Sequence, residues 1–183
     1  MIEYIRIRGA IGIKRNLGLD EITVDFSNVT GLCALEGANG LGKSTLLGLM
    51  TPYATGIPGR EGALYTHFFL RDSEVELRFT HGGHHYRKLI KLDPERKGSN
   101  TEGFMWKGLP VHLRSAPLPF CPKDAEVANA FSQVNGKISA YHKWAVQEFG
   151  SEELFFASQF QAQGSKNISQ MKTGELRGLF AEF

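Results

Sequence analysis

Residues 37–45 of this 183-residue chain, Gly-Ala-Asn-Gly-Leu-Gly-Lys-Ser-Thr, have the spacing of a phosphate-binding loop. Glycines let a backbone adopt positive φ and bring successive N–H groups against phosphate oxygens. Lys43 would place a point charge on the β- and γ-phosphates of a nucleoside triphosphate, and the Ser44 hydroxyl would be a Mg²⁺ ligand. The residues expected to contact the nucleotide are Asn39, Gly40, Leu41, Gly42, Lys43, Ser44 and Thr45.

The segments on either side of this loop predict how it is held. Residues 29–35 (VTGLCAL) form a nearly continuous apolar run, which is typical of a strand buried on both faces. Leu46, Leu47, Leu49 and Met50 then predict a helix with a wide apolar face that ends near Pro52. A buried strand, a glycine loop and a helix in this order are the structural setting that a phosphate-binding loop requires.

The rest of the chain alternates short strands with two or three helices. Residues 2–8 and 21–26 alternate apolar and polar side chains, which predicts two antiparallel strands joined by a loop over residues 9–16. Further hairpins are expected over residues 74–92, around Gly82 and Gly83, and over residues 104–113. Helices are expected at 124–131 and at 138–149, where Gly150 would end the second one. Residues 154–164 look strand-like in their second half.

The final segment predicts a helix that begins at Thr173 and carries an apolar stripe. The stripe consists of Leu176, Leu179, Phe180 and Phe183, and it is still unfinished at the last residue. A helix with an incomplete apolar face needs a partner. We therefore expect this chain to be a cut chain or one half of a split domain.

Composition excludes several classes of protein. With 42% hydrophobic and 22% charged residues, the chain is ordinary for a globular protein, and it is neither disordered nor collagen-like. No stretch reaches the ~18 apolar residues of a membrane helix. Cys33 and Cys121 cannot form a disulfide framework, so a cytoplasmic location is expected. The net charge of +2 neither requires nor excludes a nucleic-acid partner.

The loop resembles the Gly-x-Asn-Gly-x-Gly-Lys-Ser/Thr loop of ABC-type ATPases in the SMC and SbcC group, which includes the ATPase subunits of the MRN and SbcCD double-strand-break repair complexes. Residues 158–164 (SQFQAQG) resemble the Q-loop of that group, which implies that Gln163 completes the Mg²⁺ and attacking-water site. Gln159 and Gln161 remain alternatives. The basic segment at 14–16 is similar to the group's first nucleotide-contacting loop, which makes Arg15 and Asn16 candidates for nucleotide contact. The long interval between Lys43 and Gln163 resembles an SbcC-like head more than a transporter ATPase.

The resemblance implies an α/β fold, namely a P-loop NTPase in which residues 1–183 form the N-terminal half of an ABC-ATPase head with an antiparallel β subdomain. A coiled coil would begin near residues 174–183. The implied function is ATP binding by a DNA-repair ATPase that gates a partner nuclease, with Lys43 and Gln163 acting in hydrolysis. The serine-glycine-glycine signature, the Asp-Glu strand and the switch histidine of the group do not occur here. The implied partners are the C-terminal half of the same head, a second head in a homodimer, an SbcD-type nuclease and DNA, with no membrane.

Two other functions stay open at this point. One is an SMC-like or recombination-mediator ATPase that acts on DNA without a nuclease, and the other is a stand-alone P-loop kinase or GTPase. The histidines at 81, 84 and 85 are interpreted as an exposed turn rather than a metal site. Five cations, Arg87, Lys88, Lys91, Arg96 and Lys97, are interpreted as a solvated surface in preference to a DNA contact.

Overall fold

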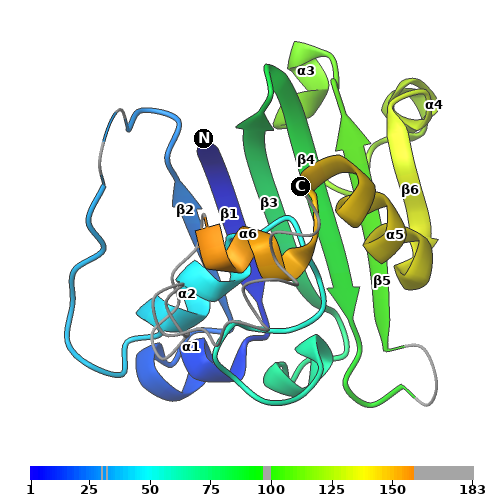
Figure 1. Cartoon of the computed structure of the whole chain (residues 1–183). Helices are drawn as coiled ribbons and strands as arrows, with labels where there is room; N and C mark the ends of the chain where they lie inside the picture. The colour runs from blue at the N-terminus through cyan, green and yellow to red at the C-terminus, as the bar shows by residue number, and fades with distance from the viewer. Residues whose placement is uncertain (30, 32, 97–99, 159–183) are drawn as a thin grey trace, which may run out of the picture.

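The computed structural model describes residues 1–29, 31, 33–96 and 100–158, and a single antiparallel sheet organises them (Figure 1). Its strand order is β2-β1-β3-β4-β5-β6, and every neighbouring pair is antiparallel. The strands are β1 (Ile2–Arg8), β2 (Glu21–Asp25), β3 (Ser73–His81), β4 (His84–Leu92), β5 (Thr101–Lys107) and β6 (Ser132–Lys137).

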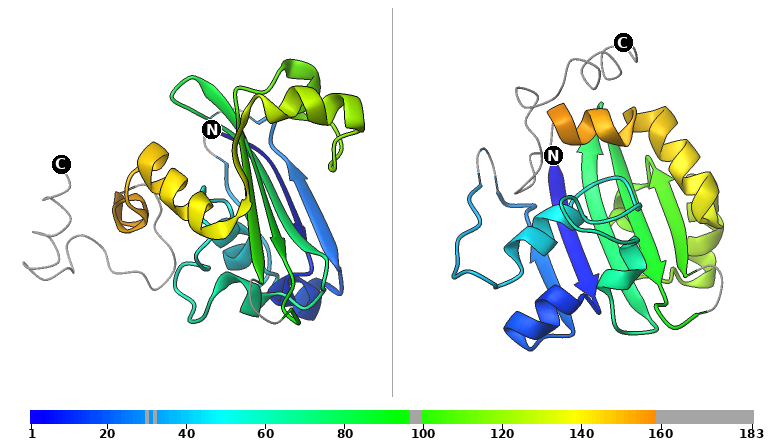
Figure 2. Two further views of the ribbon diagram at one scale, coloured as in Figure 1. Left: turned by 90° about the vertical axis from the view of Figure 1, so that its right-hand side faces the viewer. Right: turned by 60° about the horizontal axis from the view of Figure 1, so that its bottom comes forward.

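Helices cover both faces of this sheet, but unequally (Figure 2). One face, here called the inner face, carries α2 (Lys43–Leu49), α5 (Ile138–Phe149) and α6 (Glu152–Ser158). The opposite, outer face is covered at the β4–β5 end by α3 (Val111–Arg114) and α4 (Pro122–Asn129). The helix α1 (Ile11–Leu17) follows β1, and the 3-10 helix η1 (Leu64–His67) precedes β3.

The strand period of two separates two cores. Ile5, Leu77 and Ile90 point to the inner face and pack against apolar side chains of α2 and α5 in the larger core. Leu89 and Trp106 point to the outer face and pack with Leu113 and Ala128 in a smaller one. The part of the outer face over β1 and β3 is polar and receives none of these helices.

Several predictions from the sequence are confirmed. The strands at 2–8 and 21–25 pair antiparallel, and β3 and β4 form the predicted hairpin around Gly82 and Gly83. The helix at 138–149 has the predicted bounds, and Gly150, with φ of 84°, ends it. The predicted helix at 124–131 is α4, shifted by two residues toward the N-terminus.

Two predicted connections are wrong. Residues 11–17 form a helix rather than part of a loop, because Ile13 is buried on the core side and Gly18, with φ of 71°, provides a left-handed C-cap. Residues 104–113 do not form a hairpin. After β5 the chain runs through α3 and α4 before it returns as β6, and β6 escaped prediction because Val134 is its single buried side chain.

The predicted strand at 29–35 is also wrong. The described residues of this segment form no strand, and they are exposed; Val29 and Leu35 are 38% and 42% accessible. A strand buried on both faces needs hydrogen-bonded neighbours and cover on each side, and among the described residues the sheet ends at β2. Figure 1 shows the connection from β2 to α2 as a long loop that swings away from the sheet edge.

The last predicted elements lie partly within and partly outside the described residues. Residues 154–158, the first half of the segment predicted to be strand-like in its second half, belong to α6. The remainder of that segment and the helix predicted from Thr173 lie outside the described residues. The described residues contain no parallel strand pair, so the P-loop NTPase fold implied by the resemblance stays a prediction.

Candidate functional site

The glycine loop leads directly into α2, as predicted. Gly37, Gly40 and Gly42 have φ of 151°, 90° and 81°. Gly42 occupies the N-cap position of α2 in a left-handed conformation that side chains disfavour, and Lys43 is the first helical residue. The loop residues from 37 to 40 are exposed, so this backbone is open to a ligand.

Lys43 folds back over its own loop. Its Nζ donates hydrogen bonds to the carbonyl oxygens of Gly37, at 2.6 Å, and Ala38, at 2.7 Å. The ammonium thereby ties the start of the loop to the start of α2. An ammonium has three hydrogens, and two of them have acceptors among the described residues. The third is available to an anion that enters the loop.

Helix α1 lies against the loop and α2. A methyl group at Gly12 would come within 2.6 Å of Thr45 Oγ1, so this contact requires glycine. Asn16, on the next turn of α1, donates from Nδ2 to the Gly12 carbonyl oxygen at 2.7 Å, and its Oδ1 would lie 3.6 Å from a methyl group at Gly40. The structure therefore brings Asn16 to the loop, and its contact with a nucleotide stays a prediction. Arg15 is exposed on the same helix.

Behind α2 lies a contact that the sequence did not indicate. Arg60 Nη2 donates to Thr45 Oγ1 at 2.8 Å, and the Thr45 side chain is buried. Burial lowers the pKa of the nearby His67, and the charge of Arg60 lowers it further. Arg60 stands in a glycine- and proline-rich connection without periodicity, so no sequence pattern pointed to it.

The two hydroxyls after Lys43 have different surroundings. Ser44 is exposed on the first turn of α2, whereas Thr45 is buried. A hydroxyl with water and phosphate oxygens is a donor set that Mg²⁺ accepts, so Ser44 fits the metal-ligand role. Thr45 is 1% exposed, and its hydroxyl accepts a hydrogen bond from Arg60 behind the helix. Gln163 and its alternatives, Gln159 and Gln161, lie outside the described residues.

Two of the five cations interpreted as a solvated surface, Arg87 and Lys88, are buried. For these two, both the solvated surface and the alternative of a DNA contact are wrong. Arg87 and Lys88 are each 2% exposed and point to opposite faces of the sheet. Arg87 pairs with Glu76, and Lys88 donates to the carbonyl oxygens of Thr51 and Tyr53. Each cation is therefore part of a buried polar network.

The histidine-rich turn is exposed at two of its three histidines. His81 and His84 are exposed, and His85 contacts Glu3. Among the described residues, no group of three or more His, Cys, Asp or Glu side chains is arranged to hold a metal ion. Phe155 packs on Tyr53, with ring centroids 5.3 Å apart.

Comparison with known proteins returns no match, either to a family model or to a curated protein. None of the helices in the described part of the chain has the length and apolar character needed to cross a membrane.

Proposed function

We propose that this chain is the ATP-binding half of an SbcC-like DNA double-strand-break repair ATPase. The observation that carries the proposal is the loop at 37–45, in which positive-φ glycines and Lys43 precede an α-helix. Support also comes from α1, which lies against the loop where the resemblance expects a nucleotide-contacting segment. A cytoplasmic location fits this function.

Within this proposal, backbone N–H groups of residues 39–45 and the Lys43 ammonium bind the phosphates of ATP. Binding exchanges the Gly37 and Ala38 carbonyl contacts of Lys43 for phosphate oxygens, which are stronger acceptors because they are charged. Ser44, and by resemblance Gln163, would hold Mg²⁺, which supplies charge neutralisation on the phosphates. Asn16 and Arg15 would border the nucleotide from α1.

Hydrolysis is assigned to a larger assembly. The group's catalytic Asp-Glu strand and its signature loop do not occur in these 183 residues. We therefore expect that a C-terminal half, joined through a coiled coil, and a second head in a homodimer complete each site. ATP-driven closure would then gate an SbcD-type nuclease on DNA.

The first test is nucleotide binding by titration calorimetry with ATP and Mg²⁺. Lys43→Ala should weaken binding about 10- to 100-fold, because it removes a charged hydrogen bond worth about 1.5–3 kcal/mol. Lys123→Ala, an exposed lysine on α4, is the matched control and should bind like the wild type. Unchanged affinity in Lys43→Ala would refute the assignment of the loop.

A second test concerns turnover. The isolated chain should bind ATP and release negligible phosphate in a steady-state assay, because the group that activates water is missing. Rapid hydrolysis by the purified 183-residue chain, abolished by Lys43→Ala, would contradict the half-site proposal while leaving the phosphate loop intact. The two parts of the proposal can therefore fail separately.

A further inference from the structure

The segment at residues 51–55, here called the junction, connects α2 with the other helices of the inner face. It begins directly after Met50, the C-cap residue of α2. Residues 51–54 are buried, although they form neither a helix nor a strand. A buried irregular segment needs hydrogen-bond partners for its backbone polar groups. For the junction, these partners come from elements that are distant in the sequence.

Three consecutive carbonyl groups of the junction accept hydrogen bonds from buried side chains. Lys88 Nζ, on β4, donates to the carbonyl oxygens of Thr51 at 2.7 Å and Tyr53 at 2.6 Å. The hydroxyl of Tyr141, on α5, donates to the carbonyl oxygen of Pro52, which lies between them. The backbone of the junction is therefore fixed to the sheet and to α5.

The side chain of Tyr53 extends from this backbone to α6 and to the turn that precedes it. Its hydroxyl donates to the carbonyl oxygen of Gly150, the residue that ends α5, at 2.8 Å. Its ring packs against Phe155 and Phe156 of α6, with ring centroids 5.3 Å and 6.0 Å apart. Burial, and to a smaller extent the negative charge of Glu152, raises the pKa of Tyr53 to about 12, so the hydroxyl keeps the proton that it donates.

A second contact joins the junction to the first turn of α6, which lies over the inner face of the sheet (Figure 1). The hydroxyl of Thr55 donates to the carboxylate of Glu152. Beside these contacts, Phe155 and Met50 line a cavity of about 180 Å³. A side chain that faces a cavity lacks packing contacts on that side, so the place of α6 depends on its contacts with the junction.

We infer that Tyr53 is a positioning residue for the proposed nucleotide site, which it serves by holding α6 in a fixed place relative to α2. The inference rests on the proposed function, in which Lys43 at the start of α2 binds phosphate and Gln163 binds Mg²⁺. Gln163 follows Ser158, the last residue of α6, by five residues, and five residues of chain span at most about 18 Å. The place of α6 therefore limits where the side chain of Gln163 can bind.

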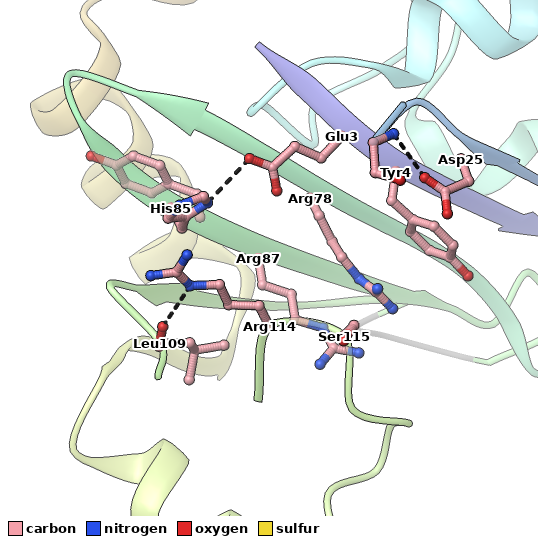
Figure 3. Close-up of a pocket in the computed structure, with 11 residues that line it drawn as sticks. Glu3, Tyr4, Asp25, Arg78, His85, Arg87, Leu109, Arg114 and Ser115 are labelled. Carbon is pink, nitrogen blue, oxygen red and sulfur yellow. Dashed lines mark hydrogen bonds and ion pairs between the residues drawn. The ribbon is translucent and has the colours of Figure 1, made fainter. Parts of the chain in front are cut away.

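The first measurement is hydrogen exchange in the nucleotide-free protein. Tyr53→Leu removes the hydroxyl and the ring, so the backbone amides of α6 should exchange at least about tenfold faster, while those of β3 and β4 stay unchanged. Tyr53→Phe keeps the ring and should give a smaller increase. The matched control is Tyr4→Leu, which replaces a tyrosine on β1 in the wall of a separate cavity on the outer face (Figure 3). Equal exchange of α6 in Tyr53→Leu and Tyr4→Leu overturns the inference.

The second measurement separates positioning from general damage to the fold. Titration calorimetry gives the dissociation constant of ATP with Mg²⁺ and with EDTA, and the ratio of the two constants reports the metal ligands. Tyr53→Leu should reduce the gain in affinity from Mg²⁺ about tenfold and leave the affinity in EDTA unchanged. Combined with Gln163→Ala, it should have no further effect, because both substitutions act on the same ligand.

The outcomes distinguish a failure of the inference from a failure of the proposed function. Additive effects of Tyr53→Leu and Gln163→Ala, or an equal loss of affinity with and without Mg²⁺, overturn the inference while the phosphate loop stands. An ATP affinity that Lys43→Ala leaves unchanged refutes the proposed function, and with it the role of Tyr53 in that site. The exchange of α6 does not depend on ATP, so it shows in either case whether Tyr53 holds the helix.

Discussion

Lys88 makes the stability of this protein depend on pH in a direction that can be measured. The side chain is fully buried on the inner face of the sheet, and its Nζ donates to the carbonyl oxygens of Thr51 at 2.7 Å and Tyr53 at 2.6 Å. A neutral amine has two hydrogens, and these two acceptors use both. Burial lowers the pKa of Lys88 from 10.5 to about 7, although the charge of Glu152 opposes the shift.

The sign of the effect follows from proton counting. Between pH 7 and pH 10.5 the unfolded chain holds a proton on Lys88 that the folded chain has lost, so the unfolding free energy rises with pH in this window. From pH 6 to pH 9 the gain is roughly 2–3 kcal/mol, taken from the two pKa values. Below pH 7 this contribution stays at its minimum, because both states are then protonated.

The perturbation is Lys88→Met, and the assay is urea unfolding followed by the fluorescence of Trp106 and Trp144 between pH 6 and pH 9. The unfolding free energy of the wild type minus that of the variant should be larger at pH 9 than at pH 6 by roughly 2–3 kcal/mol. At pH 9 the variant should also be less stable by about 2–4 kcal/mol, because two buried carbonyl groups lose their donor. Lys91→Met, a partly exposed lysine on the same strand, controls for the loss of a lysine. Parallel pH curves for the wild type and Lys88→Met would refute this reasoning.

Three further substitutions probe the packing around the two sites. Glu76→Gln should lower the unfolding free energy by about 3 kcal/mol or more in urea titrations, because it leaves buried arginine charge without its carboxylate; a loss under about 1 kcal/mol would contradict this account. Gly12→Val should destabilise the protein by about 1–3 kcal/mol and weaken ATP binding, since the side chain would collide with Thr45, and unchanged melting would show that α1 does not pack there. Tyr141→Phe should cost about 1 kcal/mol of thermal stability through the lost hydrogen bond to the Pro52 carbonyl oxygen, and no shift in melting temperature would argue against that bond.

Local patterns predicted the elements whose own residues carry the signal. The alternation in β1 and β3 reports the face that packs in the larger core, and the glycine at position 150 reports the end of α5. The strand β6 carries no such signal because it pairs through its backbone and buries one side chain, Val134. The helix α1 was not predicted because Gly12 looks like a loop residue in the sequence. In the fold, Gly12 allows a close contact with Thr45.

The buried cations show why charge in a sequence is a poor guide to exposure. Arg87 and Lys88 are adjacent on β4, and the pleat sends one to each face. Each can be buried because a partner from a distant segment meets it: Glu76 and the Leu113 carbonyl oxygen on one side, and carbonyl groups that follow α2 on the other. Such partners cannot be identified from one sequence, because a residue separation of 11 to 37 along the chain carries no pattern.

The segment at 29–35 is where the sequence pattern and the described structure disagree most, and the disagreement bears on the proposed function. Leaving its apolar side chains in water forgoes folding free energy, since burial of a Val or Leu side chain is worth about 1.5–3 kcal/mol. In the structure Val29 and Leu35 are nevertheless exposed beside a glycine loop that is already formed. Among the described residues the sheet ends at β2 and offers this run no neighbouring strand. Under the proposed function, a completing half would supply both the pairing strand and the cover. The proposed function therefore predicts that residues 29–35 form a strand beside the phosphate loop only when the completing half is present.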